Sequence, residues 1–159
     1  MTERTVVTTN LVDRKAAILQ AQADGLQHYH SNATFAADGT VLEWTSYFND
    51  PQPDWLTHFA PAIEGTGITK YNWASADVDI ATLRTFHMNL IREVRNRELF
   101  AKDIEFMRAV EAGDTDAQAT IGTEKQVLRD IPATFDITTD VDTPEKLKAK
   151  WPTELPARE

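Results

Sequence analysis

An uninterrupted helical pattern from about Asp79 to Ala112 decides most of what this chain can fold into. Apolar side chains recur along it at spacings of three and four residues, which is the period of an α-helix. Neither proline nor glycine occurs in the segment before Gly113. The apolar positions are Leu83, Phe86, Leu90, Ile91, Val94, Leu99, Phe100, Ile104, Phe106, Met107 and Val110. The pattern therefore predicts one long helix in the C-terminal half of the chain.

A second helix is expected directly after the first. Gly113 stops the long helix, because glycine readily takes the left-handed conformation that ends helices. Asp114 or Thr115 can then cap a helix over about residues 115–130, which Pro132 ends. The connection is so short that the two helices are expected to pack antiparallel.

A short third helix is expected near the C-terminus. Thr143 and Pro144 suit its N-cap and its first position, and Trp151-Pro152 closes it. Four apolar residues of the three-helix region are expected to be largely buried. They are Leu90, Val94, Ile104 and Leu128.

The first 78 residues follow different periods. A partial apolar stripe predicts a helix at about 11–27. Asp38-Gly39 lies between two β-prone runs, which indicates a two-residue hairpin turn. A helical turn at 54–59 and a further strand at 68–73 are also expected. The chain is therefore predicted to be α+β and mainly α, with a small mixed module at 1–78 and a helical domain at 79–159.

Large aromatic side chains concentrate in the first module, and they allow two interpretations. A module this small needs a few large side chains to build a core. Tryptophan and tyrosine are also favoured at surfaces that contact glycans or proteins. The core interpretation is preferred, since Trp44 and Phe48 share one face of the predicted strand. The cluster comprises Trp44, Tyr47, Phe48, Trp55, Phe59, Tyr71 and Trp73.

Motifs for catalysis, phosphate binding or metal binding are absent from the sequence. There is no cysteine, so neither disulfides nor thiolate metal sites can form. His28 and His30 would share a face of a strand and could form a weak zinc pair, but no third ligand follows at a suitable spacing. We therefore expect no catalytic, cofactor-binding or metal-binding residues, and no enzyme.

The charge and hydropathy patterns limit the possible partners. The net charge is −9, and residues 1–79 contain ten acidic and four basic side chains. Such a balance disfavours nucleic acid and anionic membranes, so a protein partner is expected. No segment has the ~18 apolar residues of a membrane span, and the N-terminus lacks the apolar region of a signal peptide.

Three segments, in the same order, resemble the tail-assembly chaperone domain of tailed bacteriophages. RNRELFAKDI at 95–104 is similar to the R-x-R-x-L-x-x-x-D-W stretch that ends the first helix of that domain. EKQVLRDIP at 124–132 resembles the second-helix signature YRQALRDIP, and WPTELP at 151–156 resembles the terminal WP-x-x-P. Ile104 and Glu124 replace the usual tryptophan and tyrosine. The resemblance covers about residues 83–156.

This resemblance implies a protein that acts by binding. Its partner would be a tail-fibre or baseplate protein, whose assembly it assists in the host cytoplasm before remaining in the virion tail. Self-association is also possible, whereas nucleic acid and membrane are not expected. The residues expected to bind the partner are Arg95, Leu99, Asp103, Leu128, Arg129, Asp130, Trp151 and Pro152.

Two other functions remain open. The chain could be a purely structural connector of the virion tail or fibre, or a glycan-binding module that uses the tryptophans of its first half. Within the LRDIP segment, Arg129 is expected in the last helical turn, where it would form an ion pair or hydrogen bonds. Trp151 is expected to be ordered, either as an anchor for a partner or as a cover for its own core.

Overall fold

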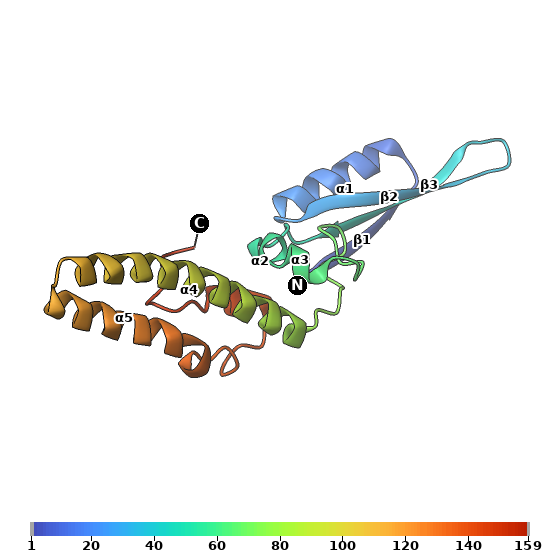
Figure 1. Cartoon of the computed structure of the whole chain (residues 1–159). Coiled ribbons are helices and arrows are strands. Elements are labelled where there is room, and N and C mark those ends of the chain that lie inside the picture. The colour runs from blue at the N-terminus through green and yellow to red at the C-terminus, as the bar shows by residue number, and fades with distance from the viewer. Residues whose placement is uncertain (1, 159) are drawn as a thin grey trace. The chain divides into compact units, whose positions relative to one another are not determined.

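A computed structural model describes residues 2–158, which form two compact units that meet between Val78 and Asp79 (Figure 1). This boundary falls at the division expected from the sequence. The chain is 51% helical and 15% strand, with one small antiparallel sheet and long C-terminal helices. The predicted fold class, α+β and mainly α, is confirmed.

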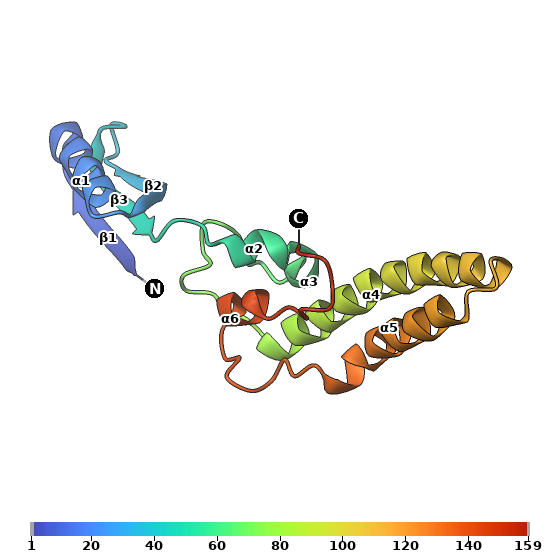
Figure 2. The same ribbon diagram turned by 90° about the vertical axis from the view of Figure 1, so that its left-hand side faces the viewer.

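The first unit is built on a three-stranded antiparallel sheet in the order β1-β3-β2. The strands and the helix between the first two of them are β1 (Glu3–Thr8), α1 (Leu11–Ala23), β2 (Gln27–Phe35) and β3 (Val41–Asn49). Figure 2 shows α1 lying along one face of the sheet. On that face Ala21, Leu26 and Phe48 form a buried cluster, with Val6 and Ile18 packed against it. Among residues 2–78, α1 is the helix that contacts all three strands, and no other helix packs against the sheet.

The turn between β2 and β3 differs from the one expected. Three residues form the loop, because the Ala36 N–H donates to the Thr40 carbonyl over 2.8 Å. The Gly39 N–H donates to the Ala36 carbonyl over 3.0 Å, and Gly39 has a φ of 83°. This geometry is a type I turn followed by a left-handed residue, the usual form of a three-residue hairpin. The predicted hairpin is present, but the two-residue turn was wrong.

The strand predicted at 68–73 does not form. Asn72 Oδ1 accepts from the Thr69 N–H over 2.6 Å, and the Trp73 N–H donates to the Thr69 carbonyl over 3.0 Å. These local bonds fold the segment into turns, because an Asn side chain competes with strand pairing for backbone groups. The third strand is β1, which the sequence analysis missed. Helix α2 (Asp54–His58) occupies the helical turn predicted at 54–59, and α3 (Ala60–Ile63) is a further short helix directly after it.

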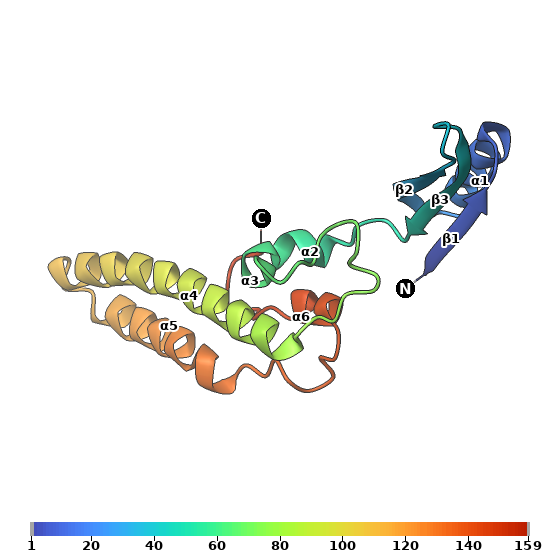
Figure 3. The same ribbon diagram turned by 90° about the vertical axis from the view of Figure 1, so that its right-hand side faces the viewer.

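The second unit is a helical hairpin followed by a short helix, as predicted (Figure 3). Its helices are α4 (Ile80–Glu111), α5 (Thr115–Thr134) and α6 (Pro144–Ala149). Side chains of Asp79, Asp114 and Thr143 cap their N-termini by accepting backbone N–H bonds. Gly113 takes a φ of 67° at the hairpin tip. The antiparallel contact between α4 and α5 is thereby confirmed.

Helix α5 continues beyond Pro132 to Thr134, so the predicted end of this helix was wrong. A proline within the last turn removes the hydrogen bond to the carbonyl four residues earlier, and its ring crowds that carbonyl, but few residues remain after it to be affected. The following turn still closes, since the Phe135 N–H donates to the Ile131 carbonyl over 2.9 Å.

Burial along the hairpin agrees only in part with the prediction. Leu128 is buried, whereas Leu90 and Val94 are half-buried. Ile104 is 42% exposed, which contradicts its predicted burial. At about 100° per residue, Ile104 lies about 140° around α4 from the buried Ala109. It therefore faces away from the packed side of α4.

Candidate interaction site

The three segments that carry the family resemblance meet in the second unit. Residues 95–104 belong to α4, residues 124–132 to α5, and residues 151–156 follow α6. A shallow pocket of about 330 Å³ has lining residues from all three segments. They are Glu98 and Lys102, then Glu124, Val127 and Leu128, and finally Glu154. We call this pocket the junction pocket.

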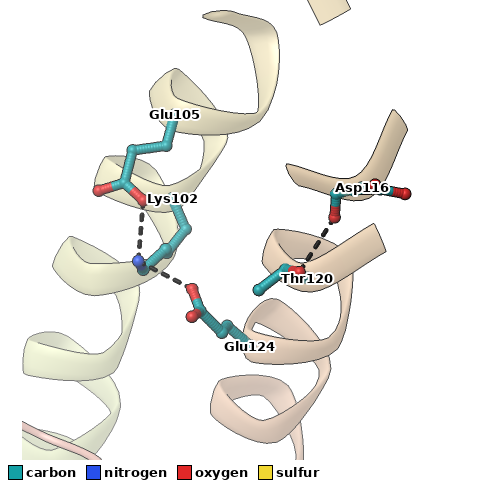
Figure 4. Close-up of polar contacts among 5 residues, drawn as sticks. All are labelled: Lys102, Glu105, Asp116, Thr120 and Glu124. Atoms are coloured by element: carbon teal, nitrogen blue, oxygen red, sulfur yellow. Dashed lines mark hydrogen bonds and ion pairs between the residues drawn. The ribbon is translucent and has the colours of Figure 1, made fainter. Parts of the chain in front are cut away.

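Ion pairs across the hairpin form one side of the junction pocket. The Lys102 ammonium lies 2.8 Å from Glu105 Oε2 and 2.9 Å from Glu124 Oε2, so it bridges α4 and α5 (Figure 4). Hydrogen bonds to Glu105 and then Glu124 raise the pKa of Lys102 above its usual value. A second bridge joins Lys125 Nζ to Asp103 Oδ1 over 2.5 Å. These bridges fix the register of the two helices.

The junction pocket is acidic with an apolar floor. Glu98 and Glu154 form no hydrogen bond or ion pair with any residue between 2 and 158. Val127 beside them is 46% exposed. Since the charge of Lys102 is already matched by two glutamates, the pocket has a net negative charge. Its chemistry suits the cationic side chain of a protein partner, with the alkyl stem on Val127.

An exposed apolar stripe follows α4 towards the hairpin tip. Phe100, Ile104 and Met107 are 68%, 42% and 56% exposed. Their spacing of four and three residues places them on one side of the helix, opposite the side that packs against the rest of the unit. We call these three residues the tip stripe. Large apolar side chains in a row on a surface mark interaction sites in soluble proteins.

The C-terminal segment is docked onto its own unit. The Trp151 indole N–H donates to the Pro156 carbonyl over 2.9 Å, and its ring lies 5.9 Å from the His87 ring. The Arg158 guanidinium lies 5.1 Å from the indole centroid. Pro152 and Leu155 are buried. At least part of the Trp151 surface therefore covers the core of its own chain.

The eight residues singled out by the resemblance fall into two groups. Leu128 and Pro152 are buried and Arg95 and Leu99 are half-buried, so these four pack at least partly within the unit. Asp103 is exposed but is paired with Lys125. The remaining three also have accessible surface. They are Arg129, Asp130 and Trp151.

Arg129 does not form the interactions expected of it. The side chain is exposed and has no hydrogen bond or ion pair within residues 2–158. Because α5 extends to Thr134, Arg129 lies before the last turn rather than within it. Its neighbour Asp130 accepts from Gln126 Nε2 over 2.8 Å. The predicted contact of Arg129 with the helix end was wrong.

The tryptophans of the first unit are poorly placed for a ligand. Trp55 and Trp73 are 2% and 4% exposed and meet edge to face at 6.3 Å. Trp44 is half-buried, with the Arg14 guanidinium 6.0 Å from its ring. These side chains are mainly core residues, as the preferred interpretation held.

The two neighbouring histidines of β2 cannot form a zinc pair. A β-bulge between them puts His28 opposite Phe48 and His30 opposite Tyr47, on the two different faces of the sheet. His28 Nε2 instead lies 2.8 Å from the Ser31 hydroxyl, which contacts the buried Ser46 hydroxyl at 2.9 Å. Burial lowers the pKa of His28 below its usual value. No group of three potential metal ligands occurs between residues 2 and 158.

Comparisons of the chain with protein-family models, curated proteins and solved structures found no match. Within the described residues, none of the helices is long and apolar enough to cross a membrane. The arguments for function therefore rest on the sequence resemblance and on the surfaces of the second unit.

Proposed function

We propose that the protein is a bacteriophage tail accessory protein that binds a tail-fibre or baseplate protein and assists its assembly. It acts by binding, without turnover, in the host cytoplasm, and remains in the virion tail afterwards. The observation that carries this proposal is the junction pocket, since the three segments with the family resemblance supply all of its lining residues.

The tip stripe provides the second argument for binding. Burial of Phe100, Ile104 and Met107 by a partner would remove a large apolar area from water, which is the main driving force of protein association. The unpaired carboxylates of Glu98 and Glu154 add a preference for a partner with basic side chains. A partner with an apolar patch beside lysine or arginine therefore fits this unit.

The proposal is tested by co-expression with the product of a neighbouring reading frame that encodes a large, repetitive fibre protein. We expect the tagged protein to retain that product on an affinity column. Phe100→Ser should weaken the retention about tenfold or more, because the side chain is a large exposed apolar group. Phe35→Ser is a matched control, since Phe35 is 61% exposed but lies on β2 in the other unit.

The outcome of this experiment decides between the two surfaces. Equal retention by the wild type, Phe100→Ser and Met107→Ser would show that the tip stripe is not used. Loss of retention in a double Glu98→Gln and Glu154→Gln variant alone would assign binding to the junction pocket. Absence of retention by the wild type, with both proteins folded, would contradict the proposed function.

A purely structural connector of the virion tail is the other candidate. Both functions use the same surfaces, but they differ in the fate of the protein. Recovery of the chain in stoichiometric amounts from purified particles, together with normal assembly of a fibre expressed without it, would favour the connector.

A further inference from the structure

All three tyrosines of the chain lie in one cluster on the first unit, although they are far apart in sequence. The Tyr29 ring lies 6.2 Å from Tyr47 and 6.4 Å from Tyr71, measured between ring centroids. His30 extends the row, with its ring 5.8 Å from that of Tyr47. The chain contains only three tyrosines, so every one of them takes part. We call these four residues the tyrosine face.

The tyrosine face belongs to the sheet surface opposite α1. Tyr47 is the residue before Phe48, whose side chain packs into the cluster beneath α1, so Tyr47 points the other way. Tyr29 occupies the β-bulge of β2 and joins His30 beside Tyr47. Tyr71 comes from the turn after α3, which is tied to the sheet by Asn49 Nδ2 donating to the Tyr71 carbonyl over 3.1 Å.

The rings lie side by side rather than covering one another. The planes of Tyr47 and His30 differ by 23°, and those of Tyr29 and Tyr71 by 22°. At centroid separations near 6 Å, nearly parallel rings are offset, so much of each ring face remains uncovered by its neighbour. Tyr71 is 47% exposed, His30 is exposed, and Tyr29 and Tyr47 are half-buried.

Neutral hydrogen-bonding side chains continue this surface. Thr5 is the cross-strand partner of Tyr47, and Thr45 pairs with Asn32 two residues further along the strands. Because side chains on a strand alternate, all three share the face of Tyr47. Hydroxyl and amide groups around aromatic rings can orient a ligand that has an apolar face and polar edges.

The charge of this unit excludes polyanionic ligands. Nine acidic and four basic side chains occur in residues 1–78, and Glu3 accepts a hydrogen bond from the Tyr29 hydroxyl over 3.3 Å. Lys70 lies 4.8 Å from the Tyr71 centroid, so its ammonium is directed at a ring. Nucleic acids and sulfated or phosphorylated polymers would be repelled by this surface.

We propose that the tyrosine face binds a neutral saccharide. The C–H side of a pyranose ring packs on an aromatic ring face, while its hydroxyls bond to side chains such as Thr5, Asn32 and Thr45. A row of four rings suits an oligosaccharide better than a single sugar. This site uses tyrosines rather than the tryptophans of the first unit, and it does not depend on the function proposed for the second unit.

The test uses the full chain labelled with 3-fluorotyrosine, which gives one ¹⁹F signal for each tyrosine, all of them within the site. The labelled protein is titrated with neutral oligomers of glucose, galactose, mannose, rhamnose and N-acetylglucosamine at millimolar concentrations. We expect at least one oligomer to shift two or more signals in a saturable manner. Heparin, a polyanionic glycan, should leave the signals unchanged.

Substitutions test whether the tyrosine rings themselves bind the saccharide. Tyr47→Ala and, separately, Tyr71→Ala should weaken the binding at least about tenfold, whereas Tyr47→Phe should retain most of it because the ring remains. Phe35→Ala, an exposed aromatic of β2 outside the cluster, should bind like the wild type. Unchanged circular dichroism identifies the variants that remain folded.

Three results would overturn this inference. The first is an unchanged ¹⁹F spectrum with every neutral oligomer. The second is equal binding by the wild type and both folded alanine variants. The third is a shift of the tyrosine signals only upon addition of the tail partner protein, which would make the face a protein interface.

Discussion

His87 is wholly buried in the second unit, where its Nε2–H donates to the Lys150 carbonyl over 2.7 Å. Burial lowers the pKa of this histidine below its ordinary value of 6.5. The unfolded chain therefore binds more protons than the folded one between the lowered pKa and pH 6.5, and the folded state loses stability as the pH falls through this window. The histidine thus makes the docking of the C-terminal segment sensitive to mild acid.

The free energy of unfolding is expected to decrease between pH 7 and pH 5, as measured by urea denaturation at several pH values. His87→Gln should flatten this dependence, although it lowers stability at pH 7 by disturbing the packing. His28, whose pKa is also lowered, accounts for part of the remaining slope. A pH dependence identical in wild type and His87→Gln would contradict this assignment.

Substitution of Arg129 can distinguish an effect on stability from an effect on partner binding. Because its side chain is exposed and unpaired within residues 2–158, Arg129→Ala should change the free energy of unfolding by less than about 0.5 kcal/mol. Weaker retention of the fibre protein by this variant would identify Arg129 as a binding residue. A larger loss of stability would show that it supports the fold.

At the scale of elements, α6 is held by Leu147, which has no exposed surface. Leu147→Ala should destabilise the protein by about 2–5 kcal/mol, the range for removing a buried leucine side chain. Val12→Ala, at a position 77% exposed on α1, should have almost no effect. Thermal denaturation of both variants checks the difference.

Deleting residues 143–159 should destabilise the protein more than Leu147→Ala does. The deletion takes away Leu147, Pro152 and Leu155 together with the indole of Trp151, so buried surface of α4 becomes exposed. We expect the truncated chain to lose cooperative unfolding. A truncated chain that folds normally and no longer binds its partner would instead assign Trp151 to the interface.

Much of the helical unit could be predicted from the sequence because its signals are local. Asp114 and Thr143 cap helices through their nearest neighbours, and Gly113 ends α4 by its own conformation. The strand β1 was missed because its partners in β3 lie about forty residues away. Conversely, the pattern at 68–73 resembled a strand, but the side chains of Thr69 and Asn72 folded it into turns.

The candidate sites were harder to predict from the sequence than the helices. The junction pocket depends on Lys102 reaching Glu124 from another helix, and no spacing in the sequence specifies that contact. The tyrosine face needs a bulge in β2 and a turn near residue 71 to bring distant residues together. By contrast, the tip stripe could be found in the sequence itself. The apolar positions of the long helix extend over more than one helix face, so some of them must be exposed.

At the scale of the whole molecule, the net charge of −9 leads to a simple prediction. Binding to nucleic acid requires basic side chains that release counterions from phosphates, and neither half of this chain has an excess of them. We expect no retardation of duplex DNA in an electrophoretic mobility shift assay at physiological salt. Binding that disappears at high salt would indicate a basic surface that the charge balance conceals.

The gathering of all three tyrosines on one sheet face also makes the protein unusual as a substrate for chemical modification. Nitration of phenol rings by tetranitromethane will place nitrotyrosine only in the first unit. The hairpin and the C-terminal segment contain no tyrosine and gain no nitrophenol under the same treatment. A single reaction can therefore disable one surface of the molecule while the other remains intact.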